Sequence, residues 1–521
     1  MSAARPSRQR ATALPDHGRR EDALARCDRA VKVAPGLGTA HFSRGCALVG
    51  LGRSEEALTC FDRVIDLAFA RVGSDAGNGC SAPSSERLAK AFAIDRDILG
   101  AFYNRGTILL SLKRYDEACA SFTQALALDP SYVDALGNRG IARAELGRCD
   151  EALADYKEAL RIAPNLPDLH VNRGHALLAL NRTDEALRCY GKALTLDPEH
   201  SDARFSVAVT RLVLGDFRAG WQQYEARWSK RIPVPRPNYP QPVWRGERQI
   251  EGKTVLLCAE QGAGDTIQFV RYAPMLAALG AEVVLKVHPS LAALTATVPG
   301  VSQIVASHGA LPPFDLYCPL LSLPLAFGTE LKSIPAPIPY VRPYEDRVIK
   351  WRGRLPPDSG RLRVGICWAG IKTHVNDRNR SIPIERFARI LSIEGVDFVS
   401  LQKEIGATDA AILNAHNVTQ PATDFEDFAD TAAVIAMLDL VISVDTAVAH
   451  LAGAMAKAVG LLVPFSPDWR WLLDRTDSPW YPTMRLFRQS AIGDWDRPIE
   501  RVRQELADVA SRAANARRPI A

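Results

Sequence analysis

The chain has 521 residues, of which 47% are hydrophobic and 24% are charged, a balance typical of soluble globular proteins. Its 64 basic and 59 acidic residues leave a net charge of +5, which is too weak and too scattered to indicate nucleic-acid binding. No apolar run approaches the roughly 18 residues that a membrane-spanning helix needs, so we expect no transmembrane segment.

The ten cysteines indicate a reducing compartment. They include no C-x-x-C pair and no Cys/His cluster with the spacing of a zinc site. Scattered cysteines of this kind are typical of reduced and mostly buried thiols. We therefore expect a cytoplasmic protein with no metal site and no resident cofactor. A frayed N-terminus and a transit peptide remain alternatives for the basic first residues.

Three successive stretches of the first half repeat one another in register. They cover residues 101–130, 135–164 and 169–198, and their glycines at Gly106, Gly140 and Gly174 define a period of 34 residues. Each stretch predicts two helices joined by a turn, with small residues where the helices touch and a closing proline. The pattern resembles the tetratricopeptide repeat and predicts an α-solenoid.

The same pattern continues on both sides of these three units. An upstream copy covers 40–68. The insertion near 69–97 that follows includes a Gly- and Ser-rich stretch, and we expect the insertion to form a protruding loop. A still earlier unit keeps its Gly18-Arg19 turn, although Pro15 argues against a complete first helix. Downstream, residues 203–228 keep the register and are expected to cap the array against the second half.

One asparagine recurs in the first helix of successive units. The three positions are Asn104, Asn138 and Asn172, each followed by Arg and Gly. Residues at equivalent positions of stacked repeats lie along one face, so these amides predict a ladder that binds the backbone of an extended peptide. The alternative is that they are solvated polar positions. The expected partner of the array is a protein or peptide.

A proline-rich segment separates the two halves of the chain. After Trp228 come prolines at positions 233, 235, 237, 240 and 242, which exclude a helix or a central strand. We therefore assign residues 1–230 to the repeat array and 231–250 to a semi-rigid linker.

The second half predicts strands alternating with helices in two successive runs. The first run includes "KTVLLCAEQGAGDTIQFVRYAPMLAALGAEVVLKVHPSL", which predicts strand, turn, helix and strand, followed by "VSQIVAS" and "FDLYCPLLSL". The second run includes "RLRVGICWAG", "GVDFVSLQKE", "LDLVISV" and "AVGLLVPF". Two runs of this kind predict two Rossmann-like lobes, a short one at 251–345 and a second one at 346–521 that ends in a helix. Ligands are expected at the carboxyl ends of the strands, in a cleft between the lobes.

The stretch "LDLVISVDTAVAHLAGAMA" predicts a buried strand, a tight turn and a helix. Asp445 or Thr446 would be the N-cap. The free N–H groups of Thr446, Ala447 and Val448 would then form an anion site, with His450 on the same helix face. The alternative is an ordinary βα unit in which the cap is only a cap.

A glycine-containing turn follows the first strand of the first lobe. The stretch "EQGAGD" contains Gly262 and Gly264 but no third glycine, so it is not a dinucleotide fingerprint. Asp265 would begin the next helix and face the cleft, where its carboxylate could take a proton from an acceptor hydroxyl. The alternative is that Asp265 only caps the helix.

Basic residues follow two strands of the second lobe. Four potentially cationic side chains lie within nine residues, namely Lys372, His374, Arg378 and Arg380. Gln402 and Lys403 lie at another strand end. Cations beside a helix N-terminus favour an anionic ligand such as a phosphate. The alternative is solvated surface.

The second half resembles a GT-B glycosyltransferase of the heptosyltransferase-like family. "SVDTAVAHLAGA" is similar to the nucleotide-diphosphate motif of that family, "GAGDT" to its first-lobe Gly-Asp turn, and "RSIPIERF" to its basic segment. The resemblance implies that Thr446, Ala447, Val448 and His450 hold the diphosphate. It also implies that Asp265 is the catalytic base and that Arg380 stands where the family has a lysine.

The whole chain therefore resembles bacterial proteins in which tetratricopeptide repeats are fused to such a transferase. The resemblance implies an inverting, metal-independent transfer from a nucleotide-diphosphate sugar to a macromolecular acceptor. The binding set would comprise Gly262, Gly264, Lys372, Gln402, Lys403, Asp445, Thr446, Ala447, Val448 and His450. Two alternatives are a non-catalytic interaction scaffold with a degenerate transferase domain, and an enzyme of the lipopolysaccharide core.

Overall fold

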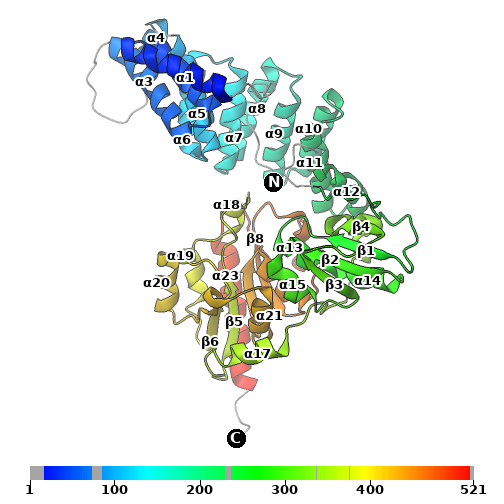
Figure 1. The fold of residues 1–521 in the computed structure, drawn as a ribbon. Coiled ribbons are helices and arrows are strands. Elements are labelled where there is room, and N and C mark those ends of the chain that lie inside the picture. The colour runs from blue at the N-terminus through cyan, green and yellow to red at the C-terminus, as the bar shows by residue number, and fades with distance from the viewer. Residues whose placement is uncertain are drawn as a thin grey trace. The chain divides into compact units, whose positions relative to one another are not determined.

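The computed structural model describes residues 17–72, 85–94, 96–228, 236–335, 337–374 and 376–516. The chain divides into two compact units, residues 2–200 and residues 201–521 (Figure 1). The first unit is helical and the second contains two parallel β-sheets. A helical repeat array followed by an α/β region was predicted from the sequence, and this is confirmed.

The first unit consists of helices that pack in consecutive pairs. They are α1 (His17–Val33), α2 (Gly38–Gly50), α3 (Ser54–Val72), α4 (Ser85–Ile94), α5 (Asp97–Ser111), α6 (Tyr115–Leu128), α7 (Val133–Glu145), α8 (Cys149–Ile162), α9 (Pro167–Ala179) and α10 (Thr183–Leu196). Helix α2 packs on α3, α5 on α6, α7 on α8, and α9 on α10. Each pair is one repeat, and each repeat also packs on its neighbour.

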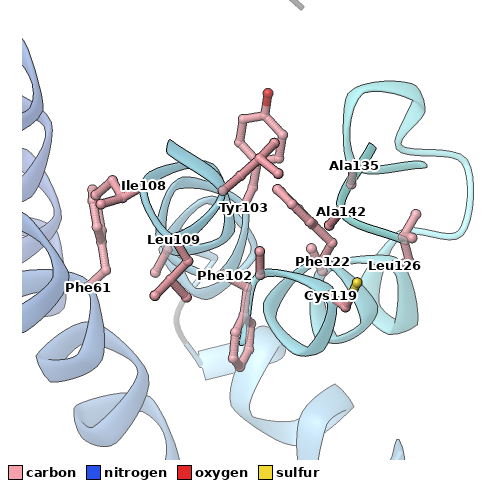
Figure 2. Packing of buried hydrophobic residues seen from close by; sticks show 14 of the residues in the cluster. Phe61, Phe102, Tyr103, Ile108, Leu109, Cys119, Phe122, Leu126, Ala135 and Ala142 are labelled. Atoms are coloured by element: carbon pink, nitrogen blue, oxygen red, sulfur yellow. The ribbon is translucent and has the colours of Figure 1, made fainter. Parts of the chain in front are cut away.

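The recurring glycines allow the two helices of each repeat to touch. A Cβ atom added to Gly106 would stand 2.7 Å from the Phe122 ring, and one added to Gly140 would stand 2.6 Å from the Tyr156 ring. Both rings are buried, and Figure 2 shows Phe122 among the packed side chains of neighbouring helices. The 34-residue period of the sequence is therefore the period of this contact between a glycine and an aromatic ring.

The insertion near 69–97 is only partly described. Residues 73–84 lie outside the described residues, so the predicted Gly- and Ser-rich loop falls largely there. The part from Ser85 to Ile94 is helix α4, which packs on α3 with Leu88 and Ala91 buried. Extending the protruding loop into this part was wrong, because two apolar positions one turn apart give this segment a buried face. The segment before α1, where Pro15 argues against a complete first helix, also lies outside the described residues.

The second unit begins with the last helical pair of the array. It comprises α11 (Ser201–Val213), α12 (Phe217–Tyr224) and the 3₁₀ turn η1 (Glu225–Trp228). These elements belong to the same compact unit as the sheets. The segment that was expected to cap the array therefore packs with the second half of the chain.

The first sheet has four parallel strands in the order β3-β2-β1-β4. The strands are β1 (Thr254–Cys258), β2 (Glu282–Val287), β3 (Val301–Ala306) and β4 (Leu316–Pro319). Two helices lie between β1 and β2, namely α13 (Ala263–Phe269) and α14 (Ala273–Ala278). Helix α15 (Pro289–Thr295) lies between β2 and β3, and α16 (Leu323–Ala326) follows β4. All four strands coincide with predicted apolar runs.

The second sheet has five parallel strands in the order β6-β5-β7-β8-β9. The strands are β5 (Leu362–Cys367), β6 (Val396–Ser400), β7 (Leu440–Val444), β8 (Ala458–Val463) and β9 (Met484–Arg488). The helices are α17 (Glu345–Arg352), α18 (Asp377–Arg380), α19 (Ile384–Phe387), α20 (Ala407–Ala415), α21 (Phe428–Ala436), α22 (Ala447–Ala454) and α23 (Asp496–Ala516). The edge strand β9 was not predicted.

The proline-rich segment packs along the edge of the first sheet from residue 236 onward. Val243 forms a parallel bridge with Tyr317 of β4, and the Trp244 N–H donates to the Tyr317 carbonyl at 2.8 Å. An edge position suits this segment because proline lacks the N–H that a central strand needs. None of the helices in the described residues is both long and apolar enough to cross a membrane.

Candidate functional site

Asp265 lies in the first turn of α13, just after β1. Gly262 is the N-cap of this helix, and its N–H donates to Asp265 Oδ2 at 2.9 Å. The other carboxylate oxygen accepts a hydrogen bond from Arg470. Burial raises the pKa of Asp265, and the Arg470 charge opposes that rise. The side chain is 20% exposed, so a carboxylate held by a backbone N–H and a guanidinium still reaches the surface.

Arg470 connects the two sheets at this point. It lies in the 3₁₀ turn η7 (Trp469–Trp471), which follows β8 of the second sheet. Its guanidinium donates to Asp265 and Gln268 of α13 and, at 2.8 Å, to Asp468 Oδ1. Since Asp265 and Arg470 are 205 residues apart, this ion pair exists only in the folded chain.

The N-terminus of α22 lies beside the same helix α13. Thr446 is the N-cap, and its hydroxyl contacts Ser443 Oγ at 3.1 Å instead of capping the helix. A Cβ atom added to Gly264 would stand 2.8 Å from His450 Cδ2 and 3.6 Å from the Ala447 Cα. The glycine therefore lets α13 approach the end of α22 whose first N–H groups have no acceptor within the helix.

His450 is buried beside this helix end, at 5% exposure. Its Nδ1 lies 2.9 Å from the Tyr481 hydroxyl, its Nε2 lies 3.7 Å from Asp445 Oδ1, and its ring stacks on Trp471. Burial lowers the pKa of His450 to about 3, so the imidazole is neutral. The structure gives His450 a packing role, and its contact with a diphosphate stays a prediction.

Asp445 occupies the turn between β7 and α22. Burial, together with the nearby Asp468 carboxylate, raises the pKa of Asp445 to about 6. Its backbone carbonyl accepts a hydrogen bond from Arg380 Nη1 at 3.0 Å. The helix end therefore has a guanidinium on one side and a weakly acidic carboxyl group within the turn itself.

Arg380 ends the short helix α18 and is 12% exposed. Its guanidinium packs directly over Gly370, where an added Cβ would clash with it. In the part of the chain that the structure describes, Arg380 Nε is buried without a hydrogen-bond partner. Among the four expected cations, Arg380 donates to the turn that precedes α22.

The remaining basic candidates differ in their surroundings. Partial burial of the ring and the Arg380 charge lower the pKa of His374 to about 4, which disfavours a positive charge at this position at neutral pH. Lys372 and Arg378 are exposed. Lys403 Nζ donates to the Phe425 carbonyl at 3.1 Å.

Gln402 joins two strand ends. Its side chain is 8% exposed, and its Oε1 accepts hydrogen bonds from the Ala369 N–H at 3.2 Å and from the Cys367 thiol. The same thiol lies 3.7 Å from the Thr446 hydroxyl. Gln402 therefore fixes the ends of β5 and β6 next to the N-cap of α22.

The three asparagines recur at equivalent positions of α5, α7 and α9. Asn104 is half-buried, whereas Asn138 and Asn172 are buried at 1% and 9% exposure. Asn138 donates to the Tyr103 hydroxyl at 3.3 Å. The alternative that these are solvated positions does not describe Asn138 and Asn172, and the peptide contact of the ladder stays a prediction.

Sequence analysis missed Arg470, Asp468, Glu260 and Arg227. Glu260 and Asp468 are charged residues that closely follow the predicted strands β1 and β8, and this was the available signal. Arg470 lies two residues after Asp468, in the same segment beyond β8. Nothing in the sequence pairs Arg470 with Asp265, or Arg227 with Glu260.

Comparison with known proteins identifies the first unit. Residues 8–70 and 87–167 match one tetratricopeptide repeat family, and residues 167–200 match another. The N-terminal region consists of tetratricopeptide repeats. Repeats of this kind are a protein-interaction motif that binds peptides and proteins.

The chain is also similar to Protein FlbA of Caulobacter vibrioides. The two are 29% identical over 332 residues, which cover 59% of this chain and 55% of FlbA, so the chain spans about half the length of this curated relative. Among solved structures, the tetratricopeptide repeat protein YrrB is 22% identical over 36% of this chain and 82% of its own, with a TM-score of 0.29. The tetratricopeptide repeat protein TTC0263 from Thermus thermophilus is 24% identical over 37% of this chain and 92% of its own, with a TM-score of 0.26.

Proposed function

We propose that residues 201–521 form a nucleotide-sugar-dependent, inverting glycosyltransferase of the GT-B, heptosyltransferase-like type, and that the repeats bring it a protein acceptor. This proposal rests on one observation: the N-termini of two helices, one following a strand of each sheet, pack against each other. Asp265 begins α13 after β1, and the Thr446 cap begins α22 after β7, with Gly264 packed on Ala447 and His450. A candidate base and a candidate anion site are thereby neighbours.

The diphosphate of the donor would bind at the N-terminus of α22. The N–H groups of Ala447 and Val448 point along the positive end of the helix dipole. Arg380 supplies a positive charge beside Asp445, and its Nε lies 3.6 Å from Asp377 Oδ1. Together they would stabilise the negative charge that develops on the leaving diphosphate.

Asp265 would act on the acceptor hydroxyl. The acceptor oxygen attacks the anomeric carbon as the bond from that carbon to the diphosphate oxygen breaks, and the diphosphate leaves with the bonding electron pair. Asp265 takes the proton of the hydroxyl. A raised pKa suits a base, and the 20% exposure of the carboxylate leaves room for an acceptor.

Thermal-shift measurements with a panel of nucleotide sugars, followed by hydrolysis and transfer assays on the hits, test the proposal. Stabilisation by one donor together with its turnover is the expected result. Binding without hydrolysis or transfer would favour the scaffold alternative, which is supported by the engagement of Asp265 with Arg470. No stabilisation by any nucleotide sugar or nucleoside diphosphate would refute the proposal.

Removing residues 1–200 tests the role of the repeats. Residues 201–521 form a compact unit by themselves, so nucleotide-diphosphate affinity should survive the deletion. Use of a protein acceptor should be lost, because the helices that would bind it are gone. Equal loss of both would contradict separate roles for the two units.

A further inference from the structure

The last helical pair of the array contributes a buried ion cluster to the second unit. Arg227 of η1 is fully buried, and Glu260, just after β1, is 1% exposed. Arg227 Nη2 and Nε donate to Glu260 Oε1 at 2.9 and 3.1 Å, and Arg227 Nη1 donates to Glu225 at 2.6 Å. Ser322 accepts a further bond from Arg227 at 2.6 Å and donates to Glu225.

This cluster holds the turn that carries Asp265. Glu260 lies two residues before Gly262, whose N–H donates to the Asp265 carboxylate. The Tyr224 side chain, on the preceding helix α12, is close enough to the Gln261 side chain for that group to lower the pKa of Tyr224. The turn from 260 to 262 is therefore tied to the last helical pair at two consecutive residues.

The same helical pair also packs on the segment that carries Arg470. The Trp221 ring of α12 lies 5.1 Å from the Trp469 ring, edge to face, and Phe217 and Tyr224 also contact Trp469. The Arg470 guanidinium lies over the same Trp469 ring, 4.2 Å from its centre. Both members of the Asp265–Arg470 pair are thus next to residues that the last helical pair holds.

We propose that the last helical pair contributes to the reaction centre. In this proposal Arg227 is a positioning residue that fixes the position of the Asp265 carboxylate through Glu260 and the 260–262 turn. The proposal rests on the proposed role of Asp265 in transfer. A buried ion pair adds little net stability compared with apolar residues of the same volume, so its physical effect is to fix geometry. A shift of about 1 Å in a catalytic group is enough to slow a reaction by about 100-fold.

The test uses the full chain with both charges removed, Arg227→Met together with Glu260→Gln, so that neither charged partner of this pair is left buried alone. Nucleoside diphosphate affinity should stay within about twofold of the parent, because the α22 site is not touched. The turnover number should fall by about tenfold or more. Amide hydrogen exchange should become faster in peptides that span residues 258–266.

The matched control is a second buried ion pair of the same unit, Arg347→Met together with Asp430→Asn. Arg347 Nη1 donates to the fully buried Asp430 at 2.8 Å, far from the 260–262 turn in sequence. The control should lower the melting temperature while leaving turnover and exchange at 258–266 at parent values. A merely structural role for Arg227 predicts the same behaviour for both double variants.

Parent-level turnover and parent-level exchange at 258–266 in the Arg227→Met/Glu260→Gln variant would overturn the proposal. If the parent protein itself transfers no sugar, the proposed function fails separately and the exchange measurement decides the positioning claim alone. Faster exchange at 258–266 then supports it, and unchanged exchange contradicts it.

Discussion

The contacts within the two units of this chain join residues at very different separations in sequence. In the repeats, the buried pair Arg139–Asp155 and the glycine–aromatic contact of Gly140 with Tyr156 each join residues 16 positions apart. In the second unit, Asp265 meets Arg470 across 205 positions, and Arg271 donates to the Trp480 carbonyl across 209. Both units bury charge, but only the glycine–aromatic contact of the first unit recurs along the described chain, at Gly106–Phe122, Gly140–Tyr156 and Gly174–Tyr190.

This difference indicates which unit can form a binding face and which can form a reactive site. A contact that recurs every 34 residues is made by every unit and suits a uniform binding face. A contact made once, between two sheets, can bring together groups of opposite character such as Asp265, Arg470, Asp468 and Asp445. Carboxyl groups with pKa values pushed upward by burial then lie beside guanidinium groups that keep others ionised.

The largest effect is expected from Asp265→Asn. The amide oxygen can still accept from the Gly262 N–H, but the side chain cannot take a proton, so turnover should fall by roughly 10²–10⁴-fold. Nucleotide-sugar affinity should be kept, since Asp265 acts on the acceptor. Single-turnover rates and dissociation constants of the purified variant measure this. Transfer at the parent rate would show that Asp265 is only a structural carboxylate of α13.

His450→Ala provides the contrast for this experiment. If the imidazole contacts the diphosphate, affinity and rate should fall together. Normal affinity with an early thermal transition would show that His450 is only a packing residue between Tyr481 and Trp471.

A second prediction concerns the pH dependence of stability. Burial raises the pKa of Glu260 from its ordinary 4.5 to about 7. A carboxyl group with a raised pKa contributes stability that is complete below its unfolded value and is lost as the pH rises through the folded value. Between about pH 5 and pH 8 the parent should lose up to about 3 kcal/mol of unfolding free energy from this group. Urea unfolding at several pH values measures the slope.

Glu260→Gln should flatten this slope, because the amide does not titrate. The exposed Glu158, which pairs with Arg161 in the array, serves as the control: Glu158→Gln should keep the parent slope in this pH range. An unchanged slope in the Glu260 variant would mean that Arg227 keeps the carboxylate ionised throughout.

A third prediction separates Arg380 from ordinary surface arginines. Arg380→Ala should weaken nucleoside diphosphate binding by about 1.5–3 kcal/mol, the range for a charge-assisted hydrogen bond. Arg386, six residues later, donates to the Gly493 carbonyl at 3.3 Å, and Arg386→Ala should leave the affinity unchanged. Isothermal titration of both variants decides whether the 372–380 segment binds an anion. Equal affinities would show that Arg380 does not bind the anion.

The smallest effects are expected in the repeats, where two glycines of adjacent helices should respond with opposite signs. A methyl group on Gly174 would strike the Tyr190 ring, so Gly174→Ala should destabilise the chain by about 1–3 kcal/mol. Gly191 has open space around its added Cβ, and Gly191→Ala should stabilise by up to about 1 kcal/mol through helix propensity. Thermal unfolding measures both. Like signs for the two would mean that the tight glycine–aromatic contact does not limit the repeats.

The sequence by itself determined the repeats, the parallel strands from β1 to β8 and the helix that begins at Thr446. These depend on local signals: a glycine every 34 residues, apolar runs of strand length, and a cap residue before helix formers. The edge strand β9 escaped because "MRLFR" is a short run with two arginines in five residues, unlike the apolar runs that indicated the other strands.

Only the tertiary structure decided which residues meet. The pairing of Arg470 with Asp265, the pairing of Arg227 with Glu260 and the lowered pKa of His374 depend on surroundings and partners up to 205 residues away. It also decided that the last helical pair packs with the sheets, since its aromatic residues bury against Trp469 and Trp480. Local patterns determine secondary structure because backbone hydrogen bonding and side-chain period are local, whereas charge state and ion pairing are set by whatever the fold brings within a few ångströms.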